Sequence, residues 1–147
     1  MKSWFYGFCF LFLLSLGHVG CSAVPEEKLI VPGKRIGPYI LGQSTLQSIM
    51  GEDTVDNRRR FSEQGVMFEF DRGRELTGVL VTVSDFATSE GLSVGSSVDD
   101  AEAIFGSPIS REVQGNLLRF DALIYGGIQF LFDENQITAI RVGAGKG

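Results

Sequence analysis

Two pairs of adjacent carboxylates are the residues of this sequence best suited to acid–base chemistry. They are Glu52-Asp53 and Asp99-Asp100, and a hydrolase can use two carboxylates as general acid and general base. Asp99-Asp100, however, opens a predicted helix over residues 98–106, where the helix dipole favours negative charge. This structural role accounts for the second pair, so we rank a carboxylate-dependent hydrolase last among the functions considered.

Nucleophiles and metal ligands of the usual kinds are almost absent. The chain has two Cys and one His, and Cys9 and His18 lie in an N-terminal segment that we expect to be removed. A chain that begins at Cys21 then keeps no His and no second Cys. This excludes a Ser–His–Asp or Cys–His centre, a Cys/His zinc site and an intrachain disulfide. We therefore predict a protein that is not an enzyme and uses neither a metal nor another cofactor.

Residues 1–20 have the pattern of a bacterial signal peptide. Lys2 supplies a positive charge, and residues 4–16 are almost wholly apolar, interrupted only by Gly7 and Ser15. This run is shorter than the roughly 20 residues of a membrane-spanning helix, but it has the length of a signal-peptide core, roughly 7 to 15 residues. Small residues follow it, so we expect export from the cytoplasm and removal of this segment.

Two cleavage sites fit the residues that follow. Val19-Gly20-Cys21-Ser22 resembles the lipobox of bacterial lipoproteins, in which the Cys is lipidated and becomes the mature N-terminus, although His18 stands where the family prefers Leu. Alternatively, signal peptidase cleaves after Ala23, with Cys21-Ser22-Ala23 as the small-residue site. We favour lipidation of Cys21, which gives a stable two-chain membrane anchor. The protein then lies in the periplasm or cell envelope, with residues 21–33 as a tether.

The mature chain is acidic. Cleavage before Cys21 leaves 12 of the 13 basic side chains and all 18 acidic ones, a net side-chain charge of −6. Phosphate binding needs a net basic face, so we predict no nucleic-acid partner. Arg58-Arg59-Arg60 is the basic cluster of the sequence. It could meet a phosphate or a lipid headgroup, but a solvated loop or a charged strand edge explains it more simply.

The mature chain contains one pattern twice. Three sequence blocks recur in the same order, which argues against chance similarity. The paired blocks are 40–44 and 92–97, 65–71 and 127–133, and 76–81 and 137–142. We therefore predict two repeats, about 34–84 and 85–143, within a single domain that spans 34–147.

Each repeat has the local pattern of a short helix followed by a β-hairpin. Ser44 and Ser97 are candidate N-caps of helices over 45–51 and 98–106, and the later blocks alternate apolar and polar residues with period two. We predict an α+β fold of two strand–helix–strand–strand(–strand) repeats. Together they form an antiparallel sheet with the short helices on one face.

The second repeat resembles part of a family of small exported bacterial proteins. Residues 88–97, followed by a short helix and Phe105-Gly106-Ser107-Pro108, resemble the Gly–Met–Thr helix and Leu–Gly–x–Pro exit of outer-membrane assembly lipoproteins of the BamE/SmpA type. The β-lactamase-inhibitor-like proteins share this general architecture in tandem. The first repeat lacks the Pro, and neither repeat has the Met. The resemblance implies the architecture and the envelope location, but it carries over no functional residue and no role in outer-membrane assembly.

One face of the predicted sheet has a composition that fits a partner protein. Met67, Leu80 and Leu131, with Arg141 nearby in the matched strand, alternate with the residues that we assign to the core. Exposed apolar residues rimmed by charge can mark a protein-binding face, whereas a second repeat or segment 107–122 packed over them would make them interior. We predict a protein-binding module of the bacterial envelope. A structural envelope-maintenance lipoprotein without a discrete ligand is the alternative.

Overall fold

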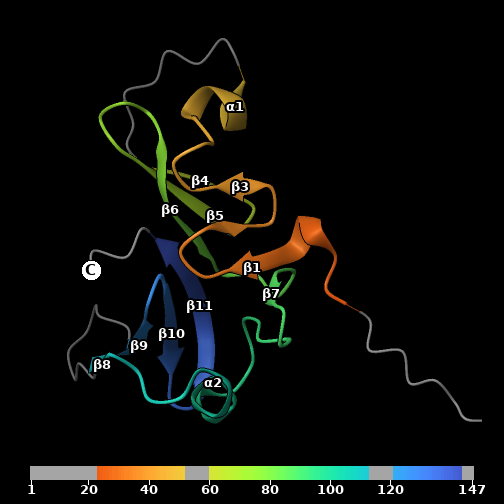
Figure 1. Cartoon of the computed structure of the whole chain (residues 1–147), viewed down its shortest axis with the longest axis vertical. Coiled ribbons are helices and arrows are strands. Elements are labelled where there is room, and N and C mark those ends of the chain that lie inside the picture. The colour runs from red at the N-terminus through yellow and green to blue at the C-terminus, as the bar shows by residue number, and fades with distance from the viewer. Residues whose placement is uncertain (1–22, 52–59, 113–120, 144–147) are drawn as a thin grey trace, which may run out of the picture.

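The computed structural model describes residues 23–51, 60–112 and 121–143, which form two β-sheets, a short 3₁₀ helix and two α-helices (Figure 1). In chain order the elements are η1 (Glu26–Lys28), β1 (Leu29–Val31), β2 (Arg35–Ile36), β3 (Tyr39–Ile40), α1 (Leu46–Met50), β4 (Arg60–Glu63), β5 (Val66–Phe70), β6 (Leu76–Val81), β7 (Ala87–Thr88), α2 (Val98–Phe105), β8 (Ser110–Glu112), β9 (Asp121–Tyr125), β10 (Ile128–Asp133) and β11 (Gln136–Gly143). The class is α+β, as the sequence predicts.

A seven-stranded antiparallel sheet is the main layer, in the order β4-β5-β6-β11-β10-β9-β8. Its middle is the pairing of β6 with β11, where Val81 faces Ile140 and Leu80 faces Arg141. Hairpins connect β4 to β5, β5 to β6, β9 to β10 and β10 to β11. The β6–β11 seam therefore joins an early and a late group of strands into one continuous sheet.

A second sheet, which the sequence pattern did not predict, packs beside the first. Its order is β3-β2-β1-β7, with β1 parallel to β7 and antiparallel to β2. Part of the expected tether over 21–33 is folded into it, because η1 and β1 lie in that segment and Ile30 is buried. The folded domain thus begins before residue 34. Strands of two or three residues are too short to show a period-two run, which explains why the pattern missed them.

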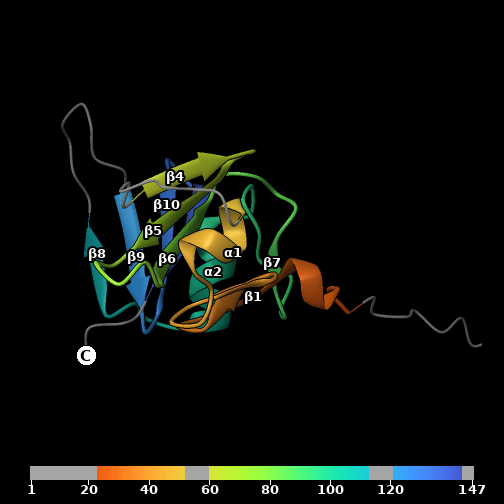
Figure 2. The ribbon, with the colours of Figure 1, turned by 90° about the horizontal axis from the view of Figure 1, so that it is seen from above.

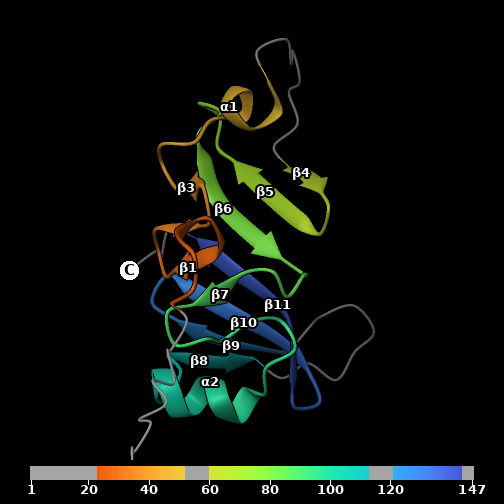
Figure 3. The same ribbon diagram turned by 90° about the vertical axis from the view of Figure 1, so that its right-hand side faces the viewer.

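The helices and the small sheet cover one face of the large sheet. Leu46 of α1, Ala101 of α2 and Ile30 of β1 belong to the same core cluster as Phe68 and Phe130 of the large sheet. Figure 3 looks onto this covered side, with β1 and β7 in front of the large sheet and α2 next to β8. One apolar core therefore lies between the large sheet and everything that covers it.

Alternation along the strands separates a buried from a half-exposed face. In β5, Val66, Phe68 and Phe70 are buried while Met67 and Glu69 are half-buried, as a two-residue period requires. A bulge follows in each long hairpin, between Glu69 and Phe70 and between Leu131 and Phe132. An extra residue in the partner strand of each bulge keeps the apolar side chains of both strands turned toward the core.

Aromatic rings fill the core under both ends of the large sheet. The ring centroids of Phe105 and Phe130 lie 5.3 Å apart, and those of Tyr125 and Phe130 lie 5.9 Å apart in an edge-to-face arrangement. At the other end, Tyr39 meets Phe68 edge-on at 4.6 Å. Edge-to-face aromatic pairs add about 0.5–1.5 kcal/mol beyond the area that they bury.

Side-chain caps fix the start of both helices, one of them a residue later than predicted. Ser97 caps α2 by accepting from the Asp100 N–H at 3.0 Å, as expected. Thr45, and not Ser44, caps α1, and it accepts from the Ser48 N–H at 3.2 Å. The Ser44 hydroxyl instead accepts from the Ile40 N–H at 2.9 Å in the preceding turn. Adjacent hydroxyl residues give the same sequence signal, so spacing alone could not choose between them.

Truncation of the central aromatic side chain should remove a large part of the stability. Phe130 is fully buried, so we expect Phe130→Ala to lower the free energy of unfolding by about 3–5 kcal/mol in urea denaturation of the mature chain followed by circular dichroism. Ile109 is 77 % exposed, and Ile109→Ala should change the same quantity by less than about 0.5 kcal/mol. Equal effects of the two variants would contradict this description of the core.

Candidate functional site

The face of the large sheet that points away from the core is the candidate functional surface. Figure 2 shows both helices and the small sheet on one side of the large sheet, with no described helix or strand on the other. We call this uncovered side the free face. Strand pairing places one row of its residues in register across all seven strands: Ser62, Met67, Leu80, Arg141, Gln129, Ile124 and Ser110.

The structure brings the four sequence-predicted residues together on the free face. Met67 lies opposite Leu80, and Leu80 lies opposite Arg141 at the seam. Leu131 lies two residues beyond Gln129 on β10, opposite Ala139 and Ala122. All four are half-buried. The late strands extend the sheet sideways and do not pack over the early ones, and β8 within segment 107–122 does the same, while residues 113–120 lie outside the described part of the chain.

An ion pair that the sequence did not predict lies in the middle of this face. Arg141 donates to the Glu69 carboxylate with a distance of 2.5 Å between Nη2 and Oε2, and the two side chains are 33 % and 22 % exposed. Sequence reasoning missed Glu69 because it is 72 positions away from Arg141. Since both groups keep contact with solvent, the pair adds at most about 1 kcal/mol to stability. Its main effect is to fix the direction of a central guanidinium.

Two glycines make room for this ion pair. Gly78 and Gly143 face each other across the seam. A Cβ atom on Gly78 would lie 2.7 Å from the Glu69 Oε2 atom, and one on Gly143 would lie 3.2 Å from the Arg141 Nη1 atom. Glycine inside a strand often marks such a close approach, so Gly78 within 76–81 was the available sequence signal. Because Gly78 and Gly143 have no side chains, the Glu69–Arg141 ion pair can lie close to the backbone of β6 and β11. Apolar side chains of the free face lie on both sides of it.

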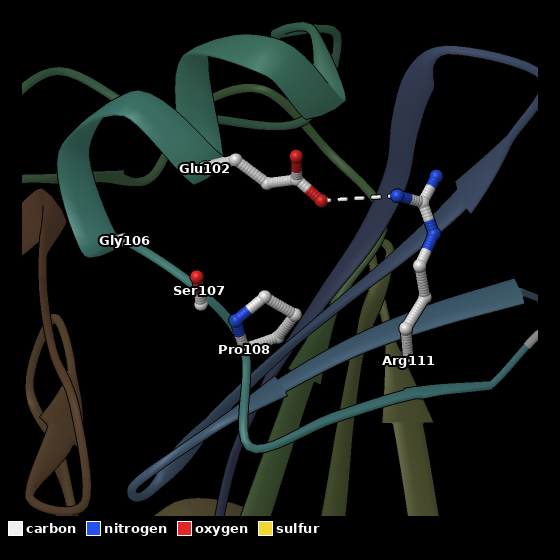
Figure 4. Close-up of a pocket in the computed structure, with 5 residues that line it drawn as sticks. All are labelled: Glu102, Gly106, Ser107, Pro108 and Arg111. Carbon is white, nitrogen blue, oxygen red and sulfur yellow. Dashed lines mark hydrogen bonds and ion pairs between the residues drawn. The ribbon is translucent and has the colours of Figure 1, made fainter.

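A shallow hollow beside the end of α2 is a second candidate site (Figure 4). It has a volume of about 450 Å³ and is lined by Glu102, Gly106, Ser107, Pro108 and Arg111. Glu102 and Arg111 point toward each other and form an ion pair at 3.1 Å. The Arg111 guanidinium carbon also lies 5.5 Å from the centre of the Phe132 ring. Both charged side chains therefore have structural partners, and no described His, Cys or further acid stands beside Ser107 to activate it.

Asp99 and Asp100 have structural partners and do not form a reaction centre with other described residues. Asp100 accepts from the Ser97 hydroxyl at 2.7 Å, and Asp99 accepts from the Asn135 amide at 3.1 Å. Both therefore serve the helix start, as expected. Glu52-Asp53 lies outside the described residues, as do Cys21 and the signal-peptide segment. Over 23–51, 60–112 and 121–143, no group of three or more His, Cys, Asp or Glu side chains could hold a metal ion.

The pKa values of Tyr125 and Glu90 are shifted by their surroundings in the fold. Burial raises the pKa of the Tyr125 hydroxyl above its ordinary value, and the nearby Glu102 carboxylate adds to the shift while Arg111 opposes it. The Tyr125 hydroxyl donates to the Gly106 carbonyl oxygen at 2.9 Å and so closes the end of α2 against the sheet. A hydrogen bond from Ser89 lowers the pKa of the Glu90 carboxyl. Both groups thus have hydrogen-bond partners within the described part of the chain, the Gly106 carbonyl oxygen for Tyr125 and the Ser89 hydroxyl for Glu90.

Comparisons with known proteins show the fold and no family. No protein-family model matches the chain, and no curated protein matches it. A solved structure, a DUF4309 family protein (YjgB) from Bacillus subtilis subsp. subtilis strain 168, is similar with a TM-score of 0.50 and 9% sequence identity, over 75% of this chain and 84% of that one. This similarity concerns the fold alone. The resemblance to the BamE/SmpA type stays a prediction.

Substitution of Gly78 tests the position of the Glu69–Arg141 ion pair on the free face. Gly78→Ala places a Cβ against the end of the movable Glu69 side chain, so the carboxylate should swing away from Arg141 while the free energy of unfolding changes by less than about 1 kcal/mol. The Nε–H signal of Arg141 in NMR spectra would report the lost contact. A Cβ on Gly126 would meet no atom within 4 Å, so Gly126→Ala is the matched control. A Gly78→Ala variant with an unchanged Arg141 signal would contradict this geometry.

Proposed function

We propose that this chain is an exported, lipid-anchored and non-enzymatic protein of the bacterial envelope that binds a partner protein with the free face of its large sheet. The observation that carries the proposal is the in-register row Met67–Leu80–Arg141 at the centre of the sheet. These side chains are half-buried and have no described element packed over them. The side chains on the other face of the same strands are buried in the core. The partial exposure of Met67, Leu80 and Arg141 therefore does not result from loose packing of the strands.

The chemistry of the free face favours a protein over other ligands. Met and Arg are enriched in protein interfaces, where an apolar centre is surrounded by a polar rim. Met67, Leu80, Ile124 and Leu131 supply the apolar part here, and Ser62 and Ser110 lie at the two ends of the row. A row of side chains that runs across seven neighbouring strands suits contact with the surface of a partner protein better than enclosure of a small molecule. The net charge of −6 for a chain that starts at Cys21 argues against nucleic acid.

We also propose that the domain consists of two copies of one unit. The hairpin registers support this, because Val66↔Val81, Met67↔Leu80 and Phe68↔Val79 correspond to Ile128↔Val142, Gln129↔Arg141 and Phe130↔Ile140. Each hairpin has its bulge at the same place, and the Thr77 and Thr138 hydroxyls donate to the Glu69 and Leu131 carbonyl oxygens. The Gly42 and Gly95 N–H groups likewise donate to the Leu76 and Ile137 carbonyl oxygens, both at 2.8 Å. Leu80 and Arg141 are then equivalent residues that face each other on the pseudo-twofold axis.

The membrane anchor in this proposal rests on the N-terminal sequence. The apolar run over 4–16 and the lipobox-like Val19-Gly20-Cys21-Ser22 support export and lipidation. Within the described ranges, no helix is long and apolar enough to cross a membrane. The resemblance of the second unit to lipoproteins of the BamE/SmpA type supports the same location. The intact mass of the purified mature protein tests the anchor: we expect a chain that begins at Cys21 with added lipid, and an unmodified chain that begins at Val24 would contradict it.

Photo-crosslinking from the free face tests the binding function. A photoreactive phenylalanine derivative in place of Leu80, in the full chain expressed in bacteria, should give the same protein adduct as the derivative in place of Leu131. Arg141→Ala combined with the Leu80 derivative should reduce that adduct severalfold, since an interface Arg often contributes more than about 1 kcal/mol to binding. Glu90 is exposed in the loop after β7, so the derivative at Glu90 is the control. An adduct that forms equally from Glu90, or none from either free-face position, would disprove the proposal.

A further inference from the structure

The folded domain starts very close to the expected lipid anchor. Glu26 begins η1, and the Lys28 N–H donates to the Pro25 carbonyl oxygen at 2.9 Å. The Gly37 N–H donates to the Leu29 carbonyl oxygen at 2.8 Å. A Cβ on Gly37 would overlap the Glu27 carbonyl oxygen, so η1 packs directly on the β2–β3 turn. With Ile30 buried in the core, the chain is held in the fold from residue 26 onward.

The length of chain between Cys21 and Glu26 limits how the domain can face a membrane. Five fully extended residues span about 18 Å at most. A folded domain of this size has a radius of gyration of about 14 Å and hence a diameter of roughly 35 Å. The link is therefore shorter than the domain is wide. The side of the domain opposite η1 therefore cannot lie on a lipid surface in which Cys21 is inserted.

The side that carries η1 is opposite the free face. β1 follows η1 and packs in the four-stranded sheet, whose Ile30 and Ile36 belong to the core between the sheets. Figure 2 shows η1 on the far side of the small sheet and the helices from the large sheet. The end of the free-face row at β8 lies away from η1 in Figures 1 and 2 alike.

We propose that, in the anchored protein, the surface formed by η1 and the β2–β3 turn lies on the lipid surface and the free face points away from it. This rests on the proposed anchoring at Cys21 and adds to it the lipid-facing surface and the orientation of the binding face. Glu27 and Lys28 are exposed there, and Arg35 pairs with Glu26 at 2.9 Å. The nearly balanced charges mean that the short link, and not attraction to anionic lipid, sets the orientation. A partner of the free face must then approach from the aqueous side.

The composition of the mature chain allows a clean orientation measurement. Trp4 is the single Trp of the sequence, and Cys21 is the single Cys after residue 20. The chain 21–147 can therefore be coupled through Cys21 to a maleimide lipid in phosphatidylcholine vesicles. Lys28→Trp then reports on the η1 side and Ser110→Trp on the free-face end, both at exposed positions. Circular dichroism of each variant checks that it is folded.

Quenching by phosphatidylcholine with a nitroxide headgroup distinguishes the two orientations. We expect the Trp at position 28 to be quenched severalfold more than the Trp at position 110, with little change when anionic lipid or salt is added. The same variants with Cys21→Ser, which cannot be coupled, should show equal and weak quenching. Equal quenching of the two coupled variants, or stronger quenching at position 110, would overturn the orientation.

Failure of the anchor and failure of the orientation give different results. Coupling fixes the link at Cys21 whether or not a cell attaches lipid there, so the quenching ratio tests the geometry alone. The intact mass of the protein from bacterial membranes tests the anchor alone. A mass without lipid would overturn the anchor and, with it, this orientation in the cell, while a lipidated protein with the reverse quenching ratio would overturn only the orientation.

Discussion

The pairing of β6 with β11 is the constraint on which the rest of the structure depends. Val79, Val81, Ile140 and Val142 face each other across this seam and are fully buried. Without the seam, each group of strands would present an open edge and half of an apolar face to water. With it, seven strands form one sheet with a single core on one side and a single free face on the other.

Successive side chains of a strand point to opposite faces of the sheet, so the residues that stabilise the core also determine which residues lie on the free face. The strands that bury Phe68 and Phe130 must turn Met67, Gln129 and Leu131 to the opposite side. The two bulges preserve this phase along both long hairpins, so the free face stays continuous across the seam. At its centre, small residues at 78 and 143 leave room for the Glu69–Arg141 ion pair. The register of strand pairing therefore determines both which side chains pack in the core and which side chains form the free face.

The sequence predicted those parts of the fold whose cause is local. Helix caps, period-two alternation and turn glycines act over a few residues, so both helices, the two long hairpins and the shared face of Met67, Leu80, Leu131 and Arg141 could be derived. Contacts between distant segments left no such signal. The ion pair joins residues 72 positions apart, and the four-stranded sheet combines strands of two or three residues. For the same reason the domain was predicted to begin at residue 34, although Ile30 is part of its core.

The measurement that most directly tests the role of the seam is native-state hydrogen exchange of the mature chain, resolved by residue. Amides that open only in global unfolding exchange with its full free energy, whereas amides of a separate unit exchange through a smaller opening. We expect the amides of β6 and β11 to be the slowest and to share the free energy measured by urea denaturation. If β10 and β11 stayed protected while β5 and β6 exchanged through a lower-energy opening, the two groups of strands would be independent units, and the single sheet described here would not be the basis of stability.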